Sequence, residues 1–473
     1  MKFNEQRTKI VATIGPSSNN YETLKQLIEA GVSTVRVNFS HGTEESHKQV
    51  YTLARKISKE LDIPVSLLLD TKGPEIRIGK MKNDACKIQK NTLLKIKTDE
   101  KSYKNLIGDE NTITVSYRMD KDLHINDKVL IDDGKLVTIV QEIKPYEIIV
   151  KTLNEHTLKT NKRINIPGIN FSLPFMSEKD KEDIIWGIKF GVDYIAASFI
   201  NSAKNVNEIR QLLKDNGGEN IQICSKIESK RGIENIDEII AASDSIMVAR
   251  GDLGLEIPYY DVPYYQKKII RKCKMAGKEV IVATQMLDSM EKSPLPTRAE
   301  VTDVYYAVEL GADATMLSGE SASGLYPIEA VKTMANIAQR AEKEYYTELF
   351  YEKQLEAIAK DSNSRLIIAY EVAKKLKDGN FKFAVVLSHT GGLLKEIAKY
   401  RPNAYIAGIV SDDKLIRNFG ITSGIFCENH SFEIRKLIKE DHNNGRKALI
   451  RFNIKKGNKF IVVDSLNITE HTF

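Results

Sequence analysis

The feature that most constrains the fold of this chain is a regular alternation of short β-branched runs with amphipathic helical patterns. Runs that alternate with helices in this way form parallel sheets. Eight such units favour a closed (β/α)8 TIM barrel, because an open doubly wound sheet is usually smaller. The eight predicted strands are Ile10–Ile14, Thr34–Phe39, Val65–Leu69, Tyr194–Phe199, Ile221–Ile227, Ser245–Ala249, Val280–Thr284 and Ala314–Leu317.

The pattern changes between the third and fourth predicted strands. From about Gly73 to Pro167, period-two runs and turn residues replace the helical pattern, and no segment is a convincing helix. Lys128–Ile131 and Lys135–Val140 flank Asp132-Asp133-Gly134, which predicts a β-hairpin. The sequence therefore predicts an inserted, β-barrel-like domain. It leaves the barrel at the carboxyl end of a strand, where barrel active sites are built, so we expect it to act as a lid.

A third region follows the eighth unit. A charged helical stretch at about 341–360 leads into a strand at Phe383–Leu387, a glycine-bearing turn, a helix at Leu393–Tyr400 and a strand at Tyr405–Val410. We expect three domains from this pattern. They are a discontinuous barrel domain (1–72 and 168–345), the inserted lid (73–167) and a C-terminal α/β regulatory domain (346–473).

Composition excludes several classes of protein. The 70 basic and 64 acidic residues leave a net charge of only +6, without a basic arm, so nucleic acid is not an expected partner. The four cysteines form no CxxC pair, which argues against a zinc site or a disulfide framework. No stretch approaches the roughly 18 apolar residues of a membrane span, and the N-terminus lacks a signal-peptide pattern. We expect a cytoplasmic protein that does not bind membranes.

Polar residues occur where the predicted strands end. Arg36, Asn38 and Ser40 alternate along the second strand, so they project to one side, and an arginine there can hold a phosphate bidentately. Lys226 and Glu228 share a face of the fifth strand because they are two residues apart. The active sites of barrel enzymes lie at this end of the strands.

The remaining strand ends complete a phosphate and metal site. The sixth strand runs into Gly251-Asp252, which provides a second carboxylate beside Glu228. Two carboxylates suit Mg²⁺, which commonly takes one or two of them together with substrate oxygens. Each residue alone has a plainer interpretation, since a single Lys-x-Glu is more often a surface ion pair and a Gly-Asp is more often a turn. Their shared position at the strand ends favours function.

Six segments resemble signatures of the pyruvate kinase family, in the family order. They are VNFSHG (37–42), DTKGPEIR (70–77), SKIES (225–229), ARGDLGLEIP (249–258), ATQML (283–287) and SPLPTRAEVTDV (293–304). The resemblance continues through LSGESASGLYPIEAV (317–331) and reaches KYRP (399–402). It implies a Mg²⁺- and K⁺-dependent enzyme that moves the phosphoryl group of phosphoenolpyruvate onto ADP, giving pyruvate and ATP, and that assembles as a homotetramer.

The resemblance also implies roles for individual residues. Arg36 and Lys226 would bind the phosphate of phosphoenolpyruvate, Gly251 and Thr284 would receive its carboxylate end, and Lys226 would stabilise the transition state. Thr284 with bound water would deliver a proton to the enolate. Glu228 and Asp252 would bind Mg²⁺; Asn38, Ser40, Asp70 and Thr71 would bind K⁺; Asn38, Phe39, Ser40, His41, Arg77 and Lys162 would contact the nucleotide.

Two departures from the family pattern concern the lid. Arg231 stands where the family usually has an acidic or amide residue, and Glu155-His156 replace a glycine pair. Neither departure touches the predicted chemistry, so both bear on lid motion. In this family a glutamate at the position of Glu75 is typical of K⁺-dependent members, so Glu75 favours K⁺ dependence. Ile78 argues the other way, because K⁺-dependent members often carry threonine at that position.

Regulation is expected in the last domain. Ser388, Thr390, Gly391 and Gly392 precede a helix, where hydroxyls and free backbone N–H groups can bind an anion. In many pyruvate kinases the matching loop holds one phosphate of fructose 1,6-bisphosphate, although here Leu393 replaces a hydroxyl residue. With Lys459–Asp464 taken as the final strand, no long loop remains for a second phosphate. We therefore expect a monophosphorylated sugar or nucleotide as activator.

Two other functions are compatible with parts of this pattern. A Mg²⁺-dependent barrel lyase or aldolase would form the enolate of a 2-oxo acid with the same acid pair and no nucleotide, but the lid and DTKGPEIR argue against it. A catalytically silent, metabolite-sensing paralogue would not need Lys226, Glu228 and Asp252 intact.

Overall fold

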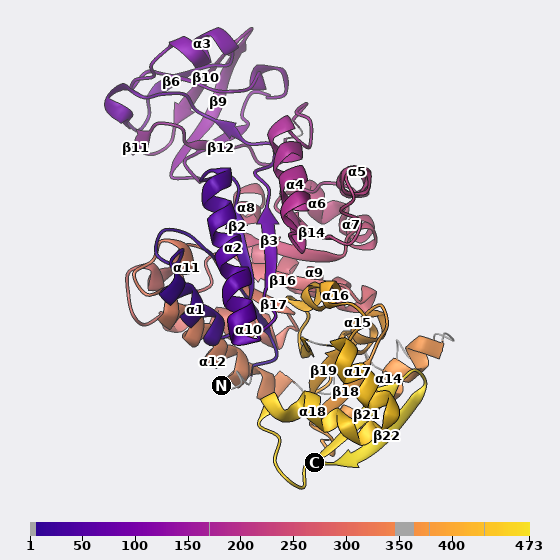
Figure 1. Cartoon of the computed structure of the whole chain (residues 1–473). Coiled ribbons are helices and arrows are strands. Elements are labelled where there is room, and N and C mark those ends of the chain that lie inside the picture. Colours follow the sequence, from indigo (N-terminus) through magenta and orange to yellow (C-terminus); the bar gives the residue numbers. More distant parts are fainter. Residues whose placement is uncertain (1–5, 170, 346–363, 378, 430) are drawn as a thin grey trace.

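The computed structural model describes residues 6–169, 171–345, 364–377, 379–429 and 431–473. Figure 1 shows three parts, with the inserted region beyond one end of a central barrel and the C-terminal region at the other end. The predicted charged helical stretch at 341–360 begins in α12 (Pro327–Tyr345), and its remainder lies outside the described residues, as does the predicted boundary at Tyr346.

Eight parallel strands close into a barrel in the order β1-β17-β16-β15-β14-β13-β3-β2. The prediction of a TIM barrel is therefore confirmed. Each observed strand overlaps its predicted run, with ends that differ by a few residues at most. The strands are β1 (Lys9–Thr13), β2 (Val32–Asn38), β3 (Ser66–Asp70), β13 (Tyr194–Ala197), β14 (Gln222–Ile227), β15 (Ser245–Ala249), β16 (Glu279–Ala283) and β17 (Ala314–Leu317).

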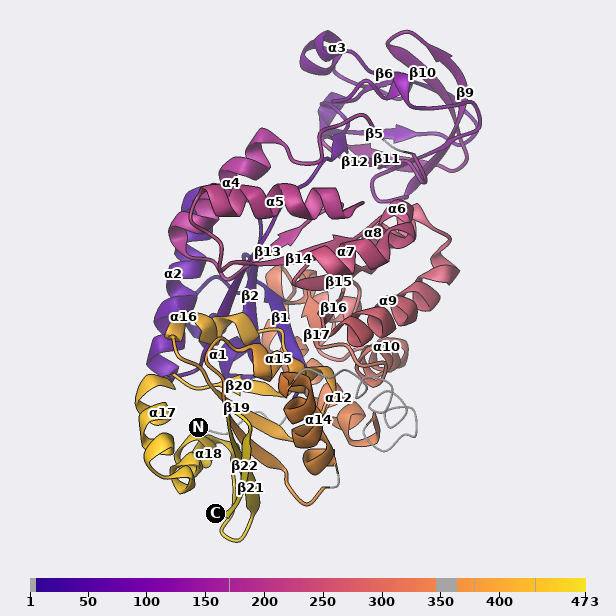
Figure 2. The same cartoon turned by 90° about the vertical axis from the view of Figure 1, so that its right-hand side faces the viewer.

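Helices surround the barrel strands on the outside (Figure 2). They pack through one apolar stripe each, as in α1, where Leu24, Leu27 and Ile28 are buried. The helices are α1 (Tyr21–Glu29), α2 (Glu44–Leu61), α4 (Glu178–Phe190), α5 (Ala203–Asp215), α6 (Lys230–Glu234), α7 (Ile236–Ala242), α8 (Arg250–Glu256), α9 (Val262–Ala276), α10 (Arg298–Glu309), α11 (Gly319–Ala322) and α12. Among the described helices, none is long and apolar enough to cross a membrane.

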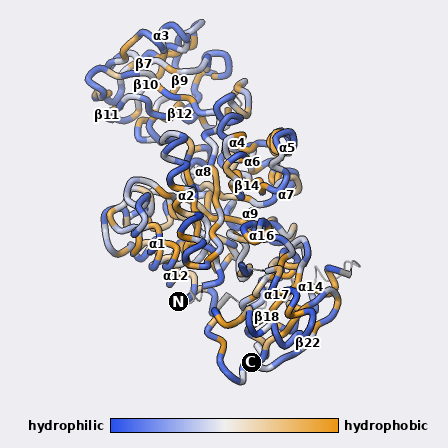
Figure 3. The backbone as a smooth tube through the Cα atoms, viewed as in Figure 1, coloured by the Kyte–Doolittle hydropathy of each residue, from blue (hydrophilic) through white to orange (hydrophobic). Residues whose placement is uncertain are grey.

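The barrel has two hydrophobic layers. One lies between the strands and the helices and includes Ile10, Val35 and Leu69. The other fills the barrel interior with side chains such as Leu68 and Met247. Figure 3 shows the result as hydrophobic stretches along the strands that alternate with hydrophilic stretches outside. The interior is a packed core, so the chemistry must lie at the ends of the strands.

The inserted region is a curled, seven-stranded sheet in the order β4-β12-β8-β9-β10-β6-β7. An isolated bridge between Ile78 and Val115, next to β4 and β7, joins its two edges, so the sheet is nearly closed. The predicted hairpin is β8 with β9. One short helix, α3 (Glu100–Asn105), corrects the expectation of no helix. The strands are β4 (Ile76–Arg77), β5 (Ala85–Ile88), β6 (Leu93–Lys97), β7 (Thr112–Thr114), β8 (Lys128–Ile131), β9 (Leu136–Lys144), β10 (Glu147–Thr152), β11 (His156–Lys159) and β12 (Arg163–Asn165); β5 pairs with β11.

The C-terminal region has a five-stranded sheet in the order β20-β19-β18-β21-β22. Its strands are β18 (Phe383–Leu387), β19 (Tyr405–Ile409), β20 (Ile425–Cys427), β21 (Lys459–Asp464) and β22 (Asn467–Thr472), with helices α14 (Ser364–Lys377), α15 (Gly392–Lys399), α16 (Asp413–Ile416), α17 (Ser431–Glu440) and α18 (Arg446–Leu449). The expectation that Lys459–Asp464 is the final strand is wrong. Ser465 adopts a positive φ, which lets the chain reverse and pair β22 antiparallel to β21.

The C-terminal region closes the amino-terminal end of the barrel. Ile421 belongs to the same buried cluster as the barrel-interior side chains Leu68 and Met247. Around it, Arg401 pairs with Asp313 at 2.7 Å and Thr422 Oγ1 donates to Glu279 Oε1 at 3.0 Å. The C-terminal region therefore plugs the interior of the barrel at this end.

Candidate active site

A cavity of about 360 Å³ lies at the carboxyl ends of the barrel strands, between the barrel and the lid. Barrel residues from β2, β3, β14 and α8 line its floor, and lid residues line its roof. The structure brings most of the predicted site residues to this cavity. Those that line it are Arg36, Asn38, Ser40, His41, Asp70, Thr71, Arg77, Lys162, Lys226, Glu228, Asp252 and Thr284.

The floor of the cavity is a chain of buried ion pairs. Arg36 Nε donates to Asp70 Oδ2 at 2.7 Å, and its Nη1 donates to Thr13 Oγ1 at 2.6 Å. Lys226 Nζ lies 3.0 Å from Asp70 Oδ1 and 3.0 Å from Glu228 Oε1. Two cations thus converge on one wall, each held in place by a carboxylate, which is what a bound phosphate requires.

The charge states in this cluster follow from burial and pairing. Burial works against the charged form of Lys226, but Asp70 and Glu228 outweigh it and raise the pKa of Lys226, so the ammonium stays charged. Arg36 and Lys226 likewise overcome burial and lower the pKa of Asp70. Burial, with a smaller contribution from Asp252, outweighs the opposing effect of Lys226 and raises the pKa of Glu228 to about 7. A further cation beside Glu228 would favour its charged form.

Glu228 and Asp252 both line the cavity, and each presents a carboxylate to it. Glu228 Oε2 accepts a hydrogen bond from Phe199 N at 2.6 Å, which fixes its orientation. The two carboxylates repel each other, as the effect of Asp252 on Glu228 shows, so a cation between them relieves the repulsion. Among the described residues, no group of three or more His, Cys, Asp or Glu side chains could hold a metal alone. Two carboxylates fit Mg²⁺ where a substrate supplies further oxygens.

Thr284 is held in a strained backbone conformation at the end of β16. The φ of Thr284 is +70° and that of Gln285 is +52°, values that residues other than glycine rarely adopt. Thr284 Oγ1 accepts from Gly251 N at 2.7 Å, and a Cβ on residue 251 would lie 3.4 Å from that oxygen. The strain and the contact place the Thr284 hydroxyl and the Gly251 backbone at the same wall of the cavity.

Arg250 maintains this strained turn, and the sequence did not reveal that role. Its Nη2 donates to the Thr284 carbonyl oxygen at 2.7 Å, and its Nη1 donates to Asp303 Oδ1 at 2.6 Å. Arg250 follows β15 directly within ARGDLGLEIP, so its position at a strand end was the available signal. Ser198 was missed as well; its hydroxyl accepts from Lys226 Nζ at 2.8 Å.

The predicted K⁺ residues lie on the β2 and β3 side of the cavity. Asn38 Oδ1 accepts from Ser40 N at 3.0 Å, and Thr71 Oγ1 accepts from Ser198 N at 3.1 Å. Both oxygens of Asp70 already face cations, Arg36 and Lys226. Oxygens of Asn38, Ser40 and Thr71 are hard donors of the kind that an alkali cation takes.

The predicted nucleotide residues divide into two groups. Asn38, Ser40 and His41 line the barrel side, while Arg77 and Lys162 line the lid side. Phe39 is different, because its side chain is buried and packs against His47 with ring centroids 4.0 Å apart. Phe39 can therefore offer only its backbone to a ligand. Lys162 Nζ lies 3.0 Å from Asp132 Oδ1 in the hairpin turn.

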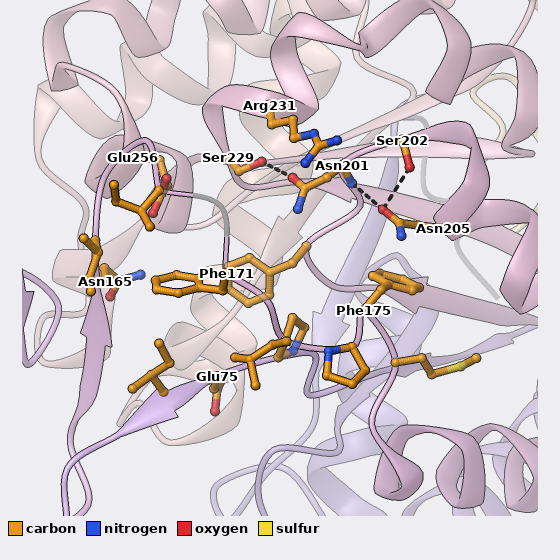
Figure 4. A pocket seen from close by; sticks show the side chains of 18 of the residues that line it. Glu75, Asn165, Phe171, Phe175, Asn201, Ser202, Asn205, Ser229, Arg231 and Glu256 are labelled. Carbon is orange, nitrogen blue, oxygen red and sulfur yellow. Dashed lines mark hydrogen bonds between the residues drawn. The ribbon is translucent and has the colours of Figure 1, made fainter. Parts of the chain in front are cut away.

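A second cavity of about 580 Å³ adjoins the first and lies beneath the segment that returns from the lid. Figure 4 shows Phe171 and Phe175 from that segment facing Asn201, Ser229 and Arg231 of the barrel. Glu75, Arg163 and Phe199 line both cavities. The departure at Arg231 thus lies against the base of the lid.

Glu155 and His156, the second departure from the family pattern, make their contacts within the lid. His156 Nε2 lies 2.8 Å from Asp132 Oδ2, so it fastens the hairpin turn that roofs the cavity. Glu155 pairs with Lys87 at 3.3 Å on the surface. Both residues stay away from the catalytic floor, as the sequence indicated.

The predicted effector residues lie apart from the barrel cavity, between β18 and α15. Gly391 has a φ of +82° and precedes α15. Ser388 Oγ accepts from Leu393 N at 3.3 Å, while the Leu393 side chain is buried in the core of the C-terminal region. A Cβ on Gly392 would lie 2.9 Å from Arg365 Nη1, so a guanidinium adjoins this loop.

Comparisons with known proteins agree with this geometry. Residues 5–331 match the family model described as "Pyruvate kinase, barrel domain". The pyruvate kinase of Mycoplasma genitalium is 40% identical over 458 residues, covering 89% of each chain. That of Bacillus licheniformis is 43% identical over 434 residues, covering 90% of this chain and 73% of the other. A crystal structure of a pyruvate kinase from Cryptosporidium parvum superposes with a TM-score of 0.90 at 36% identity, over 99% of this chain and 96% of that one.

Proposed function

The chain belongs to the pyruvate kinase family, and we propose that the cluster around Lys226 is where it transfers the phosphoryl group of phosphoenolpyruvate to ADP. Members of this family are phosphotransferases. The observation that carries the proposal is the buried Lys226, held between Asp70 and Glu228 and beside Arg36 on the wall of an open cavity.

Arg36 and Lys226 hold the phosphate of phosphoenolpyruvate. Phosphoryl transfer needs positioning and neutralisation of charge more than covalent help from the protein. Lys226 supplies a charge that burial leaves unscreened, so it stabilises both the transferring group and the enolate oxygen that is left behind. Arg36 is fixed by Asp70 and Thr13, so it needs little reorganisation when the phosphate arrives.

Glu228 and Asp252 would hold Mg²⁺, which supplies positive charge to the phosphoryl oxygens when bound. Asn38, Ser40, Asp70 and Thr71 would hold K⁺. The carboxylate end of the substrate lies against Gly251 and Thr284. The Thr284 hydroxyl, together with water, lies on the wall from which a proton reaches the enolate carbon.

ADP lies between the barrel and the lid. Asn38, the Phe39 backbone, Ser40 and His41 contact it from the barrel, and Arg77 and Lys162 meet its phosphates from the lid. This arrangement explains why a lid is present, because phosphoryl transfer competes with hydrolysis unless water is excluded.

A coupled assay for ADP-dependent formation of pyruvate from phosphoenolpyruvate tests the proposal. We expect turnover that requires ADP and Mg²⁺. A lyase or aldolase would form pyruvate without a nucleotide, and a silent paralogue would form none, so either result would contradict the proposal. The intact Lys226, Glu228 and Asp252 and the presence of the lid disfavour both alternatives.

Regulation is proposed at the loop formed by Ser388, Thr390, Gly391 and Gly392, with a phosphorylated metabolite as ligand. The adjoining Arg365 adds a cation that the sequence did not indicate. The residues after β21 are taken up by a tight turn and β22, which leaves no long loop there for a second phosphate. Titration of sugar monophosphates and of fructose 1,6-bisphosphate against the phosphoenolpyruvate saturation curve distinguishes the two classes, and strong activation by the bisphosphate would refute the preference for a monophosphate.

Three further features are proposed on the same basis. The functional units would be 1–72 with 168–345, 73–167 and 346–473. The enzyme would act in the cytoplasm. It would assemble as a homotetramer, and sedimentation equilibrium can test this oligomeric state.

A further inference from the structure

Arg163 is a lid residue that reaches the catalytic floor. It lies in β12, opposite Arg77 of β4, and its guanidinium meets three carboxylates. Nη2 lies 2.6 Å from Asp252 Oδ1 and 3.0 Å from Asp133 Oδ1, and Nη1 lies 3.6 Å from Glu75 Oε1. These carboxylates outweigh the effect of burial and raise the pKa of Arg163, so it remains a cation.

The three carboxylates come from three separate segments. Asp252 is in α8 of the barrel, Asp133 is in the turn of the lid hairpin, and Glu75 is where the chain leaves the barrel for the lid. Arg163 therefore joins the lid to the barrel. Nearby contacts are weaker, since Gly168 N donates to Glu256 Oε2 at 3.3 Å and a Cβ on Gly134 would lie 3.1 Å from Leu255 Cδ2.

The contact with Asp252 places the Arg163 guanidinium on a carboxylate that would also hold the divalent cation. Asp252 Oδ1 is buried and has no hydrogen-bond partner, so the Arg163 ion pair is what compensates its charge. A metal ion held by the same carboxylate would be close to the guanidinium, and two cations at a short separation repel each other. Arg163 and a divalent cation are therefore competitors for Asp252.

We propose that Arg163 is an exchangeable counter-ion: it holds the lid against the barrel while the metal site is empty, and the divalent cation displaces it. This inference rests on the proposed role of Asp252 as a metal ligand. Arg163 is thus a positioning residue, which couples occupancy of the metal site to the freedom of the lid.

The displaced guanidinium has other partners within reach. Asp133 and Glu75 remain beside it; Glu75 lines both cavities, and Figure 4 shows it at the second. Release from Asp252 therefore does not leave a partly buried cation unpaired. These remaining partners lower the free-energy cost of the exchange, as a reversible exchange requires.

Binding of Mn²⁺ without substrates or nucleotide, measured by electron paramagnetic resonance, tests the competition. We expect Arg163→Met to bind Mn²⁺ about tenfold more tightly than the wild type, as expected when a close charge pair is removed from one side. Arg163→Lys should return the affinity toward that of the wild type. Lys135→Met is the matched control, because Lys135 is a lid cation that lies 4.0 Å from Asp132 with its side chain 61% exposed, outside the lining of the cavity, and the Mn²⁺ affinity of this variant should change by less than about twofold.

Hydrogen exchange, measured without and then with Mn²⁺, provides a second test. Amides of the Asp132–Gly134 turn should exchange faster in Arg163→Met than in the wild type, and Mn²⁺ should speed their exchange in the wild type alone. Equal Mn²⁺ affinity in Arg163→Met and the wild type, or unchanged exchange at the turn, would overturn the inference. If Arg163→Met does not fold, Arg163→Gln repeats both measurements with the polarity retained.

Asp252→Asn separates this inference from the proposed function. If Asp252→Asn still binds Mn²⁺ as the wild type does, the assignment of Asp252 as a metal ligand is wrong, and the competition falls with it. If Asp252→Asn loses Mn²⁺ while Arg163→Met matches the wild type, the metal ligand stands and only the competition is refuted.

Discussion

Buried ion pairs occur at both ends of the barrel, but they are used differently. At the carboxyl end, Arg36, Lys226 and their carboxylates line a cavity of about 360 Å³. At the amino end, Arg401 and Asp313 pair at 2.7 Å beside a space of only about 20 Å³. The same types of side chain therefore make a binding site where room remains and a structural joint where it does not.

The difference shows that buried charge alone does not identify a site. The pKa of Glu228 stays raised by burial even beside Lys226, whereas Arg401 donates to the Ala312 carbonyl oxygen at 2.8 Å in addition to its pair with Asp313. We therefore expect changes at the carboxyl end to affect rate and changes at the amino end to affect stability. Four experiments test that division.

Lys226→Met should give the largest effect. The variant removes the charge that stabilises the transferring phosphoryl group, so the turnover number should fall about 10³-fold, or about 4 kcal/mol. The fold should persist, because methionine fills a similar volume. Steady-state kinetics and circular dichroism check this. A folded Lys226→Met protein with nearly normal turnover would refute the assignment of the carboxyl end.

Arg401→Met should affect stability instead. It leaves Asp313, whose pKa burial already raises, as an uncompensated buried acid, so the free energy of unfolding should fall by about 3 kcal/mol. Turnover per folded molecule should stay within about twofold. Chemical denaturation and active-site titration measure both quantities. A large loss of turnover without a loss of stability would break the comparison.

The pH dependence of stability should carry a signature of the amino end. Burial, with a smaller contribution from Arg401, outweighs the opposing effect of Asp313 and lowers the pKa of Lys274 to about 7. In the unfolded chain a lysine holds its proton to about pH 10.4, so between pH 7 and 9 the unfolded state binds more protons and stability rises with pH.

Lys274→Met should remove that dependence, reducing the gain in stability between pH 7 and 9 by up to about 2 kcal/mol. Denaturation at pH 7, 8 and 9 provides the measurement, with Lys272→Met as control, since Lys272 pairs with Asp237 on the surface. Parallel pH profiles for the wild type and Lys274→Met would show that Lys274 is charged in the folded protein.

The dependence of turnover on a monovalent cation should give the smallest of the four effects, and it should arise at the carboxyl end of the barrel. Replacing K⁺ with tetramethylammonium should lower turnover about tenfold, or about 1.4 kcal/mol, because the larger cation cannot contact Asn38, Ser40 and Thr71 together. Stability at the amino end should not change. Equal rates in the two salts would refute the K⁺ proposal and the interpretation of Glu75.

The barrel could be predicted from the sequence because buried parallel strands read as β-branched runs. Val65–Leu69 and Ser245–Ala249, for example, lie within a residue of β3 and β15. Shorter elements could not be predicted in this way. α3 has six residues, and β22 (NITEHT) has Ile468 as its one apolar residue and lies at a sheet edge, so neither carries a strong hydrophobic signal.

The candidate site divides in the same way. Residues that project from predicted strands, such as Arg36 and Lys226, could be placed because the pleat and the barrel fix their direction. Arg163 could not be placed, since its meeting with Asp252 depends on how the lid folds back over the barrel. The buried state of the Phe39 side chain was also hidden, because the alternation along β2 does not reveal which helix covers it.

Closure of the barrel pairs the two ends of its sequence, since Lys9 of β1 lies in register with Ala314 of β17. During synthesis on the ribosome, β1 must therefore wait until most of the chain has emerged before its second neighbour exists. The inserted sheet requires no residue beyond β12, so it can mature while the barrel is still an open, half-built sheet with exposed edges. We expect this interval to be when the nascent chain most needs protection from aggregation.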